Sequence, residues 1–121
     1  MTPRPRDVVV VGASAGGVEA LRAMVAQLPA DLPASILVVL HLPSGGTSAL
    51  PAILDRSGPL PAAAARNGEP LEHGRVYVAR PDHHLLVLED AVALSHGPTE
   101  NGHRPAINAL FRSAAVARGL R

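Results

Sequence analysis

The sequence contains no cysteine and no lysine, and only two of its 121 residues are aromatic. Without cysteine the chain has neither disulfide bonds nor thiolate ligands for a metal. Hydrophobic residues nevertheless make up 47% of the chain. A core with so few aromatic side chains must be built from Val, Leu, Ile and Ala, and such a core suits layered sheets and helices.

Charge is nearly balanced, because eleven arginines face ten acidic residues and leave a formal net charge of +1. The sequence contains no block of like charge, so its charge pattern does not indicate nucleic acid or an anionic membrane as a partner. The longest apolar run, around residues 36–40, is far shorter than the roughly 20 residues of a membrane helix. The N-terminus MTPRPRD lacks the apolar core of a signal peptide. We therefore expect a cytoplasmic protein without membrane insertion, with residues 1–6 disordered.

Residues 7–41 have the pattern of one βαβ unit. The expected strands, residues 7–11 and 35–40, contain the continuous apolar runs 8–11 and 36–40, typical of strands buried on both faces of a parallel sheet. Between them, apolar residues recur at helical spacing, at Val18, Leu21, Met24, Val25 and Leu28. The two strands are expected to be parallel, with their ends side by side.

The remaining sequence predicts shorter elements. Thr47 can cap a helix whose apolar face holds Leu50, Ile53 and Leu54. Residues 75–79, 85–88 and 91–95 are short β-prone runs separated by turn residues, and we expect them to form an antiparallel meander. A last helix begins at Pro105, with Leu110, Phe111 and Ala114 on one side. The fold expected is α/β: a doubly wound, mainly parallel, Rossmann-like sheet in three layers with this meander.

The candidate chemistry lies at residues 12–17, GASAGG, where the first strand meets its helix. The segment fits the G-x-S-x-G form of a nucleophile elbow. The glycines Gly12, Gly16 and Gly17 permit a sharp turn that carries Ser14 to the top of the sheet. Backbone N–H groups at the helix start, from Ala15 onward, point the same way and can stabilise an oxyanion. The same turn also fits a phosphate site, so a nucleotide-binding βαβ module is the alternative.

His41 favours the hydrolase interpretation. A dinucleotide site has glycine at the position of Ser14 and an acidic residue at the end of the second strand. This chain has a histidine there, at the tip of the strand next to Ser14. A neighbouring base is what a serine hydroxyl needs to act as a nucleophile. We predict Ser14 as nucleophile and His41 as base; alternatively, His41 ends its strand and packs under the loop at Pro43.

Four separated segments resemble, in order and spacing, the CheB methylesterase family of chemotaxis proteins: VVVGASAGGVEAL, LVVLHLPSG, HGRVYVARPDHHL and HGPTENGHRPAINALF. The resemblance runs from about Asp7 to the last residue. It implies that Ser14 and His41 belong to a Ser-His-Asp triad. The implied activity is hydrolysis of glutamate methyl esters, and deamidation of glutamines, on the cytoplasmic helices of methylated chemotaxis receptors.

The resemblance implies that residues 7–121 are the N-terminal two thirds of the family domain. The family segment T-G-M-G-x-D-G, which carries the triad aspartate, has no counterpart before Arg121, and the receiver domain has none before residue 7. We therefore expect a domain incomplete at its C-terminus. A catalytically inactive interaction module that self-associates through an uncapped sheet edge is a further alternative.

The resemblance also places Asp82 and His84, and further on His103 and Arg104, near the family's cleft. Asp82 is the internal acid best placed to orient His41, although a turn acid bonded to its own backbone is the simpler role. His103 and Arg104 equally fit a solvated helix start. Because the six histidines show no helical pair at metal-ligand spacing, we expect neither a metal nor a cofactor.

Overall fold

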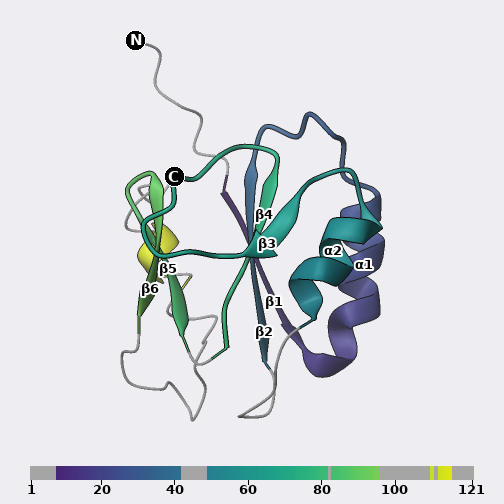
Figure 1. The fold of residues 1–121 in the computed structure, drawn as a ribbon, viewed down its shortest axis with the longest axis horizontal. Coiled ribbons are helices and arrows are strands. Elements are labelled where there is room, and N and C mark those ends of the chain that lie inside the picture. Colours follow the sequence, from purple (N-terminus) through teal and green to yellow (C-terminus); the bar gives the residue numbers. More distant parts are fainter. Residues whose placement is uncertain (1–7, 42–48, 82, 96–109, 111, 116–121) are drawn as a thin grey trace.

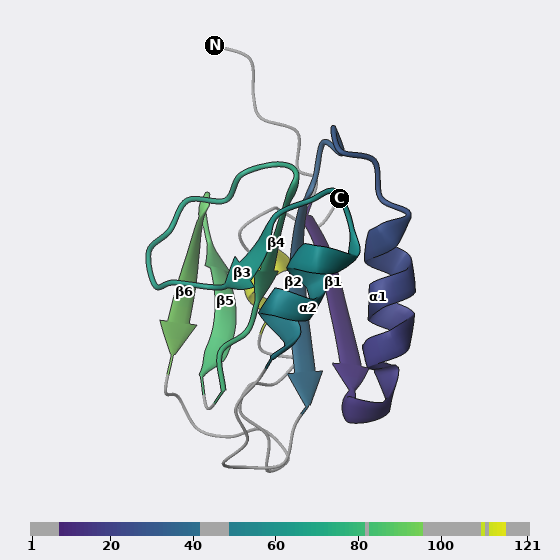
Figure 2. The ribbon, with the colours of Figure 1, turned by 45° about the vertical axis from the view of Figure 1, so that its right-hand side comes forward.

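The computed structural model describes residues 8–41, 49–81, 83–95, 110 and 112–115 (Figure 1). Two helices lie on one face of a four-stranded sheet and a two-stranded hairpin lies on the other (Figures 1 and 2). In chain order the elements are β1 (Val8–Ser14), the 3-10 turn η1 (Ala15–Gly17), α1 (Val18–Ala26), β2 (Ser35–His41), α2 (Leu50–Ser57), β3 (Ala62–Ala64), β4 (Arg75–Val78), β5 (His84–Leu88) and β6 (Ala91–Ser95).

The four-stranded sheet has the order β1-β2-β4-β3, and every neighbouring pair is parallel. Strands β5 and β6 pair antiparallel in a separate hairpin. The predicted α/β class, with a mainly parallel sheet and a small antiparallel part, is confirmed. The βαβ unit predicted for residues 7–41 is found over the described residues 8–41, because β1 and β2 are adjacent and parallel and α1 connects them.

Strand β2 forms the centre of the core because its side chains alternate between two buried clusters. Ile36 and Val38 face the helices, where they pack with residues of α1, α2 and β4. Leu37 and Val39 face the hairpin. The helix-side cluster holds Leu21, Val25, Ile36, Val38, Leu40, Leu50, Leu54, Leu60, Val76 and Val78. With no large aromatic residue to fill it, this core depends on close packing of branched aliphatic side chains.

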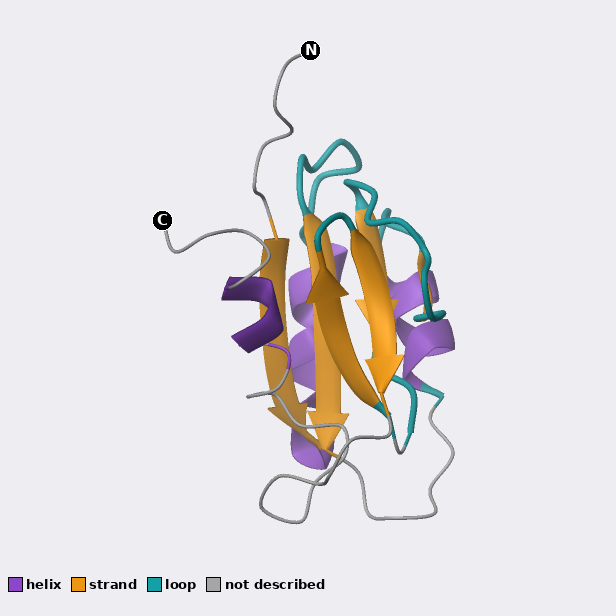
Figure 3. Ribbon diagram, turned by 90° about the vertical axis from the view of Figure 1, so that its left-hand side faces the viewer, coloured by secondary structure: helices purple, strands orange, loops and turns teal. Residues whose placement is uncertain are grey.

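Residues 110 and 112–115 are helical and lie on the hairpin side of the sheet (Figure 3). Leu110 and Ala114 are buried in the same cluster as Leu85 and Val87 of β5. The Ser113 hydroxyl accepts a hydrogen bond from the Val87 N–H at 3.0 Å. The buried side predicted for the last helix is thus found at Leu110 and Ala114, whereas Thr47, Pro105 and the side chain of Phe111 lie outside the described residues.

The predicted meander is wrong for its first strand. Arg75–Val78 pairs parallel with both β2 and β3 instead of joining the hairpin. The physical reason is burial on both faces: Val76 and Val78 pack toward the helices, and Tyr77 packs toward the hairpin. A strand without a solvent-facing side belongs inside a parallel sheet. The three alanines of β3 were not predicted to form a strand.

Strand β1 is less buried than its sequence predicts. In the described sheet it pairs on one side only, with β2. Val9 is 44% exposed, and Val8, Val10 and Val11 are half-buried. The all-valine run therefore reflects a parallel strand, as predicted, but not one covered on both faces by the described residues.

Tyr77 anchors the chain segment that leads into β4. Its hydroxyl accepts a hydrogen bond from the Glu72 N–H at 2.8 Å and donates one to the Pro70 carbonyl at 3.0 Å. The hydroxyl of Ser35, at the start of β2, donates to the Glu72 carbonyl at 2.9 Å. Burial raises the pKa of Tyr77, and its bond to the Glu72 backbone opposes this effect. The backbone N–H and carbonyl of the exposed residue Glu72 are therefore both hydrogen-bonded to side chains of the sheet.

Candidate active site

Ser14 and His41 occupy the carboxyl ends of the two adjacent parallel strands. They are the last partners in the β1–β2 register, Ser14 opposite His41. Neighbouring strands are about 4.8 Å apart, so the backbones of the two residues lie side by side. The side chain of His41 is outside what the structure describes. In Figure 2 the arrowheads of β1 and β2 point to the same end of the molecule.

The side chain of Ser14 is exposed. Its backbone is extended, with φ −87° and ψ 172°, and its hydroxyl makes no capping hydrogen bond to the turn that follows. Because side chains alternate along a strand, Ser14 belongs to the face of β1 that carries Val8 and Val10, which pack on the hairpin-side cluster. Ser14 thus ends β1 with an exposed side chain that does not cap the turn after it.

The turn after Ser14 contains no residue with a positive φ angle. Among the described residues, positive φ angles occur only at Gly68, Gly74 and Glu89. The chain therefore passes from β1 into α1 without a left-handed residue. A Cβ on Gly16 would meet no atom within 4 Å, whereas one on Gly17 would lie 3.1 Å from the Cβ of Ala13. Close packing accounts for the glycine at 17, and the glycine at 16 leaves open space beside the turn.

Gly12 and Ala15 complete this segment. Gly12 lies within β1, opposite Val39 of β2. Ala15 begins η1, which runs directly into α1 at Val18. The first N–H groups of a helix have no carbonyl partner within it, and the positive end of its dipole lies there. The backbone of residues 15–17 thus brings hydrogen-bond donors next to Ser14, as an oxyanion site requires.

His84 begins β5 and is 4% exposed. It lies opposite Ser95 in the hairpin. A short connection joins His84 to the carboxyl end of β4, which is parallel to β2, so it lies at the same end of the sheet as His41. In that connection the Nδ1 atom of His83 lies 2.8 Å from the Pro81 carbonyl oxygen. Asp82, His103 and Arg104 are outside the described residues.

Two observations concern the described residues as a whole. In the described ranges, no group of three or more His, Asp or Glu side chains is arranged to hold a metal ion. None of the described helices has the length and apolar character needed to cross a membrane.

Comparison with known proteins identifies the family and the fold. Residues 9–120 match the family model for CheB methylesterase. A protein-glutamate methylesterase/protein-glutamine glutaminase 2 of Methanosarcina acetivorans is 40% identical over 125 aligned residues, which cover 97% of this chain and 35% of the relative. A protein-glutamate methylesterase/protein-glutamine glutaminase 3 of Anaeromyxobacter dehalogenans is 45% identical over 119 residues, which cover 97% of this chain and 34% of the relative.

Among solved structures, the catalytic domain of the Thermotoga maritima CheB methylesterase matches with a TM-score of 0.83 and 35% identity, over 91% of this chain and 60% of that one. The chain spans about a third of the length of the curated relatives it matches. Because the family model and these relatives together cover nearly all of its residues, the chain belongs to the CheB methylesterase family.

Proposed function

We propose that this domain hydrolyses methyl esters of glutamate side chains in proteins, with Ser14 as the nucleophile and His41 as its general base. The observation that carries the proposal is the β1–β2 register, which sets Ser14 opposite His41 at the carboxyl ends of adjacent strands. The names of the relatives, which pair glutamate methylesterase with glutamine glutaminase, support the substrate class.

In the proposed mechanism, His41 accepts the proton of the Ser14 hydroxyl while its Oγ attacks the ester carbonyl carbon. The carbonyl oxygen becomes an oxyanion, and N–H groups of residues 15–17 donate hydrogen bonds to it. The tetrahedral intermediate then collapses, and the departing methoxide oxygen takes the proton from His41, so that methanol is released. His41 then takes a proton from a water molecule as that water attacks the acyl-serine, and it returns the proton to Ser14 Oγ as the glutamate carboxylate leaves. With a glutamine substrate the leaving group is ammonia.

The proposed substrates are methylated glutamates on the cytoplasmic helices of chemotaxis receptors, and the proposed location is the cytoplasm. The exposure of Ser14 suits a substrate side chain on the surface of a folded protein, because such a side chain can reach an exposed hydroxyl directly. His84, His103 and Arg104 are proposed to border the cleft. Asp82 is proposed as the acid that orients His41. The variant Asp82→Asn tests this role, and it is expected to lower turnover without changing the thermal unfolding temperature.

The test is methanol release from methyl-labelled receptor membranes. Ser14→Ala is expected to abolish release, and His41→Gln to lower turnover about 10²–10⁴-fold. His73→Gln is the matched control, because His73 lies just before β4, at the opposite end of the parallel sheet. It is expected to keep full activity. Equal release by the unaltered chain and by folded Ser14→Ala contradicts the proposal.

A further inference from the structure

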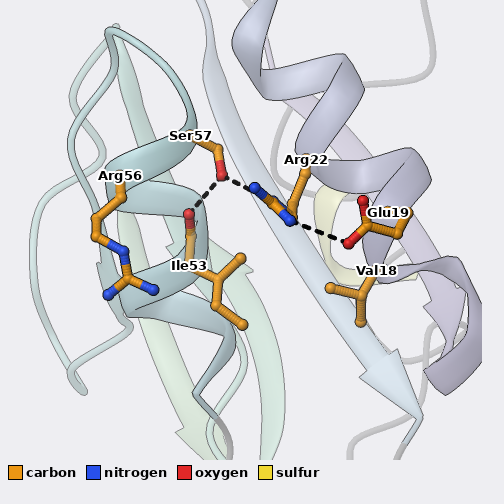
Figure 4. A pocket seen from close by; sticks show the side chains of 6 residues that line it. All are labelled: Val18, Glu19, Arg22, Ile53, Arg56 and Ser57. Atoms are coloured by element: carbon orange, nitrogen blue, oxygen red, sulfur yellow. Dashed lines mark hydrogen bonds and ion pairs between the residues drawn. The ribbon is translucent and has the colours of Figure 1, made fainter.

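A groove of about 330 Å³ lies between α1 and α2, on the outer face of the helix layer (Figure 4). Its size is at the lower end of ligand-binding pockets, which suits one or two side chains. Ile53 and Val18 supply apolar surface, and Arg22 and Arg56 supply guanidinium groups. In Figure 4, Ile53 lies between the two arginines. The proposed ester chemistry does not use any of these side chains.

Arg22 is held across the groove. Its Nε donates to the Ser57 hydroxyl at 3.3 Å, and its Nη1 lies 3.0 Å from a carboxylate oxygen of Glu19 (Figure 4). The Ser57 hydroxyl in turn donates to the Ile53 carbonyl at 2.6 Å. The Arg22 side chain is still 50% exposed. A guanidinium has five N–H donors, so these two contacts leave donors that a ligand can reach.

Arg56 gives the groove its surplus of positive charge. In the described part of the chain no carboxylate pairs with Arg56. Asp55, the acid next to it, accepts a hydrogen bond from the Ala62 N–H at 3.0 Å. The groove thus presents two guanidinium groups against one carboxylate, that of Glu19. The planar guanidinium group of arginine can form two parallel hydrogen bonds to the two oxygens of a carboxylate, so it matches this group in geometry as well as in charge.

We propose that the α1–α2 groove binds an acidic side chain of the protein substrate, outside the ester that Ser14 attacks. This inference rests on the function proposed above. Only η1 separates Ser14, on the hairpin face of β1, from Val18, which lines the groove on the helix side, so a polypeptide that passes around the carboxyl end of β1 can engage both places. Nucleic acid is less suited, because phosphate backbones are bound by many cations and the groove offers two beside an acid.

The test uses a fluorescent octapeptide of alternating Glu and Ala, titrated into the 121-residue chain and followed by anisotropy. The same peptide with Gln in place of Glu is the neutral control. Arg22→Gln and Arg56→Gln are each expected to weaken binding about 1.4- to fivefold, the range of exposed ion pairs. Glu19→Gln is expected to strengthen it, because it removes the carboxylate that competes for Arg22. High salt is expected to weaken all binding to the groove.

Arg66→Gln is the matched control, since it removes the same charge elsewhere. Arg66 is exposed, and its neighbours Asn67 and Gly68 hydrogen-bond to β6 on the hairpin side. It is expected to leave binding unchanged. The inference is overturned if the Glu peptide does not bind, if the Gln peptide binds equally, or if Arg22→Gln and Arg56→Gln change nothing. If the unaltered chain releases no methanol, but the Glu peptide binds and Arg22→Gln and Arg56→Gln weaken that binding, only the esterase function is refuted.

Discussion

Gly58 lies where the end of α2 meets α1, and Gly58→Ala tests how closely the two helices pack. A Cβ there would lie 2.8 Å from the carbonyl carbon of Val25 and 2.9 Å from its Cγ1, with the Val25 carbonyl oxygen closer still. Two of these three are backbone atoms of α1, and Val25 is fully buried. Rotating a side chain does not relieve such contacts, so α1 and α2 must move apart.

Overpacking of this kind costs about 1–3 kcal/mol. Alanine also lowers the entropy of the unfolded chain, which offsets about 0.4–1 kcal/mol of that cost. We therefore expect the free energy of unfolding to fall by about 1–2 kcal/mol. With an unfolding entropy of about 2.1 cal/mol/K per residue, this loss lowers the Tm of a chain of this length by about 4–8 °C.

The assay is thermal unfolding followed by circular dichroism, with Gly16→Ala as the matched control. A Cβ at Gly16 meets no atom within 4 Å, and its φ is not positive, so this variant is expected to unfold at the original temperature or slightly above it. If Gly58→Ala unfolds at the temperature of the unaltered chain, or Gly16→Ala falls as far, the packing argument is refuted.

Three further predictions concern the core. Tyr77→Phe leaves the Glu72 N–H and the Pro70 carbonyl without their hydroxyl partner, and urea unfolding should show a loss of about 1–3 kcal/mol; an unchanged midpoint contradicts this. Burial raises the pKa of Tyr77, so the unfolded chain loses this proton first. Stability is then kept below about pH 10 and lost above it, and the loss should be smaller in Tyr77→Phe. Leu85→Ala, at a fully buried site, should cost about 2–5 kcal/mol. Leu88→Ala, at a site 57% exposed, should stay within about 0.5 kcal/mol, and equal losses would contradict the assigned burial.

The sequence predicts the βαβ unit well because its signals are local. A valine run, a glycine-rich turn, a segment with helical spacing and a second apolar run follow one another along the chain. A helical crossover between two strands of one sheet makes those strands parallel. The opposition of Ser14 and His41 in the register follows from that unit. Their catalytic roles remain predictions, which the variants above test.

Other features depend on contacts between distant segments, which local patterns do not contain. Arg75–Val78 is too short for periodicity to separate a buried parallel strand from a meander strand. Ala62–Ala64 forms a strand through its pairing with β4, since alanine has little β-propensity of its own. The groove unites Arg22 and Arg56 from two helices, and no sequence pattern links them. The exposure of β1 likewise depends on which segments cover it.

The central claim is that Ser14 is a nucleophile activated by His41, and labelling with a fluorophosphonate probe tests it most directly. Such a reagent forms a covalent bond with an activated serine, and mass spectrometry of the digested protein locates the adduct. The account predicts an adduct on Ser14 that is absent in Ser14→Ala, forms about 10²-fold or more slowly in His41→Gln, and forms normally in His73→Gln. An adduct on another serine, or labelling at the same rate without His41, would contradict the account.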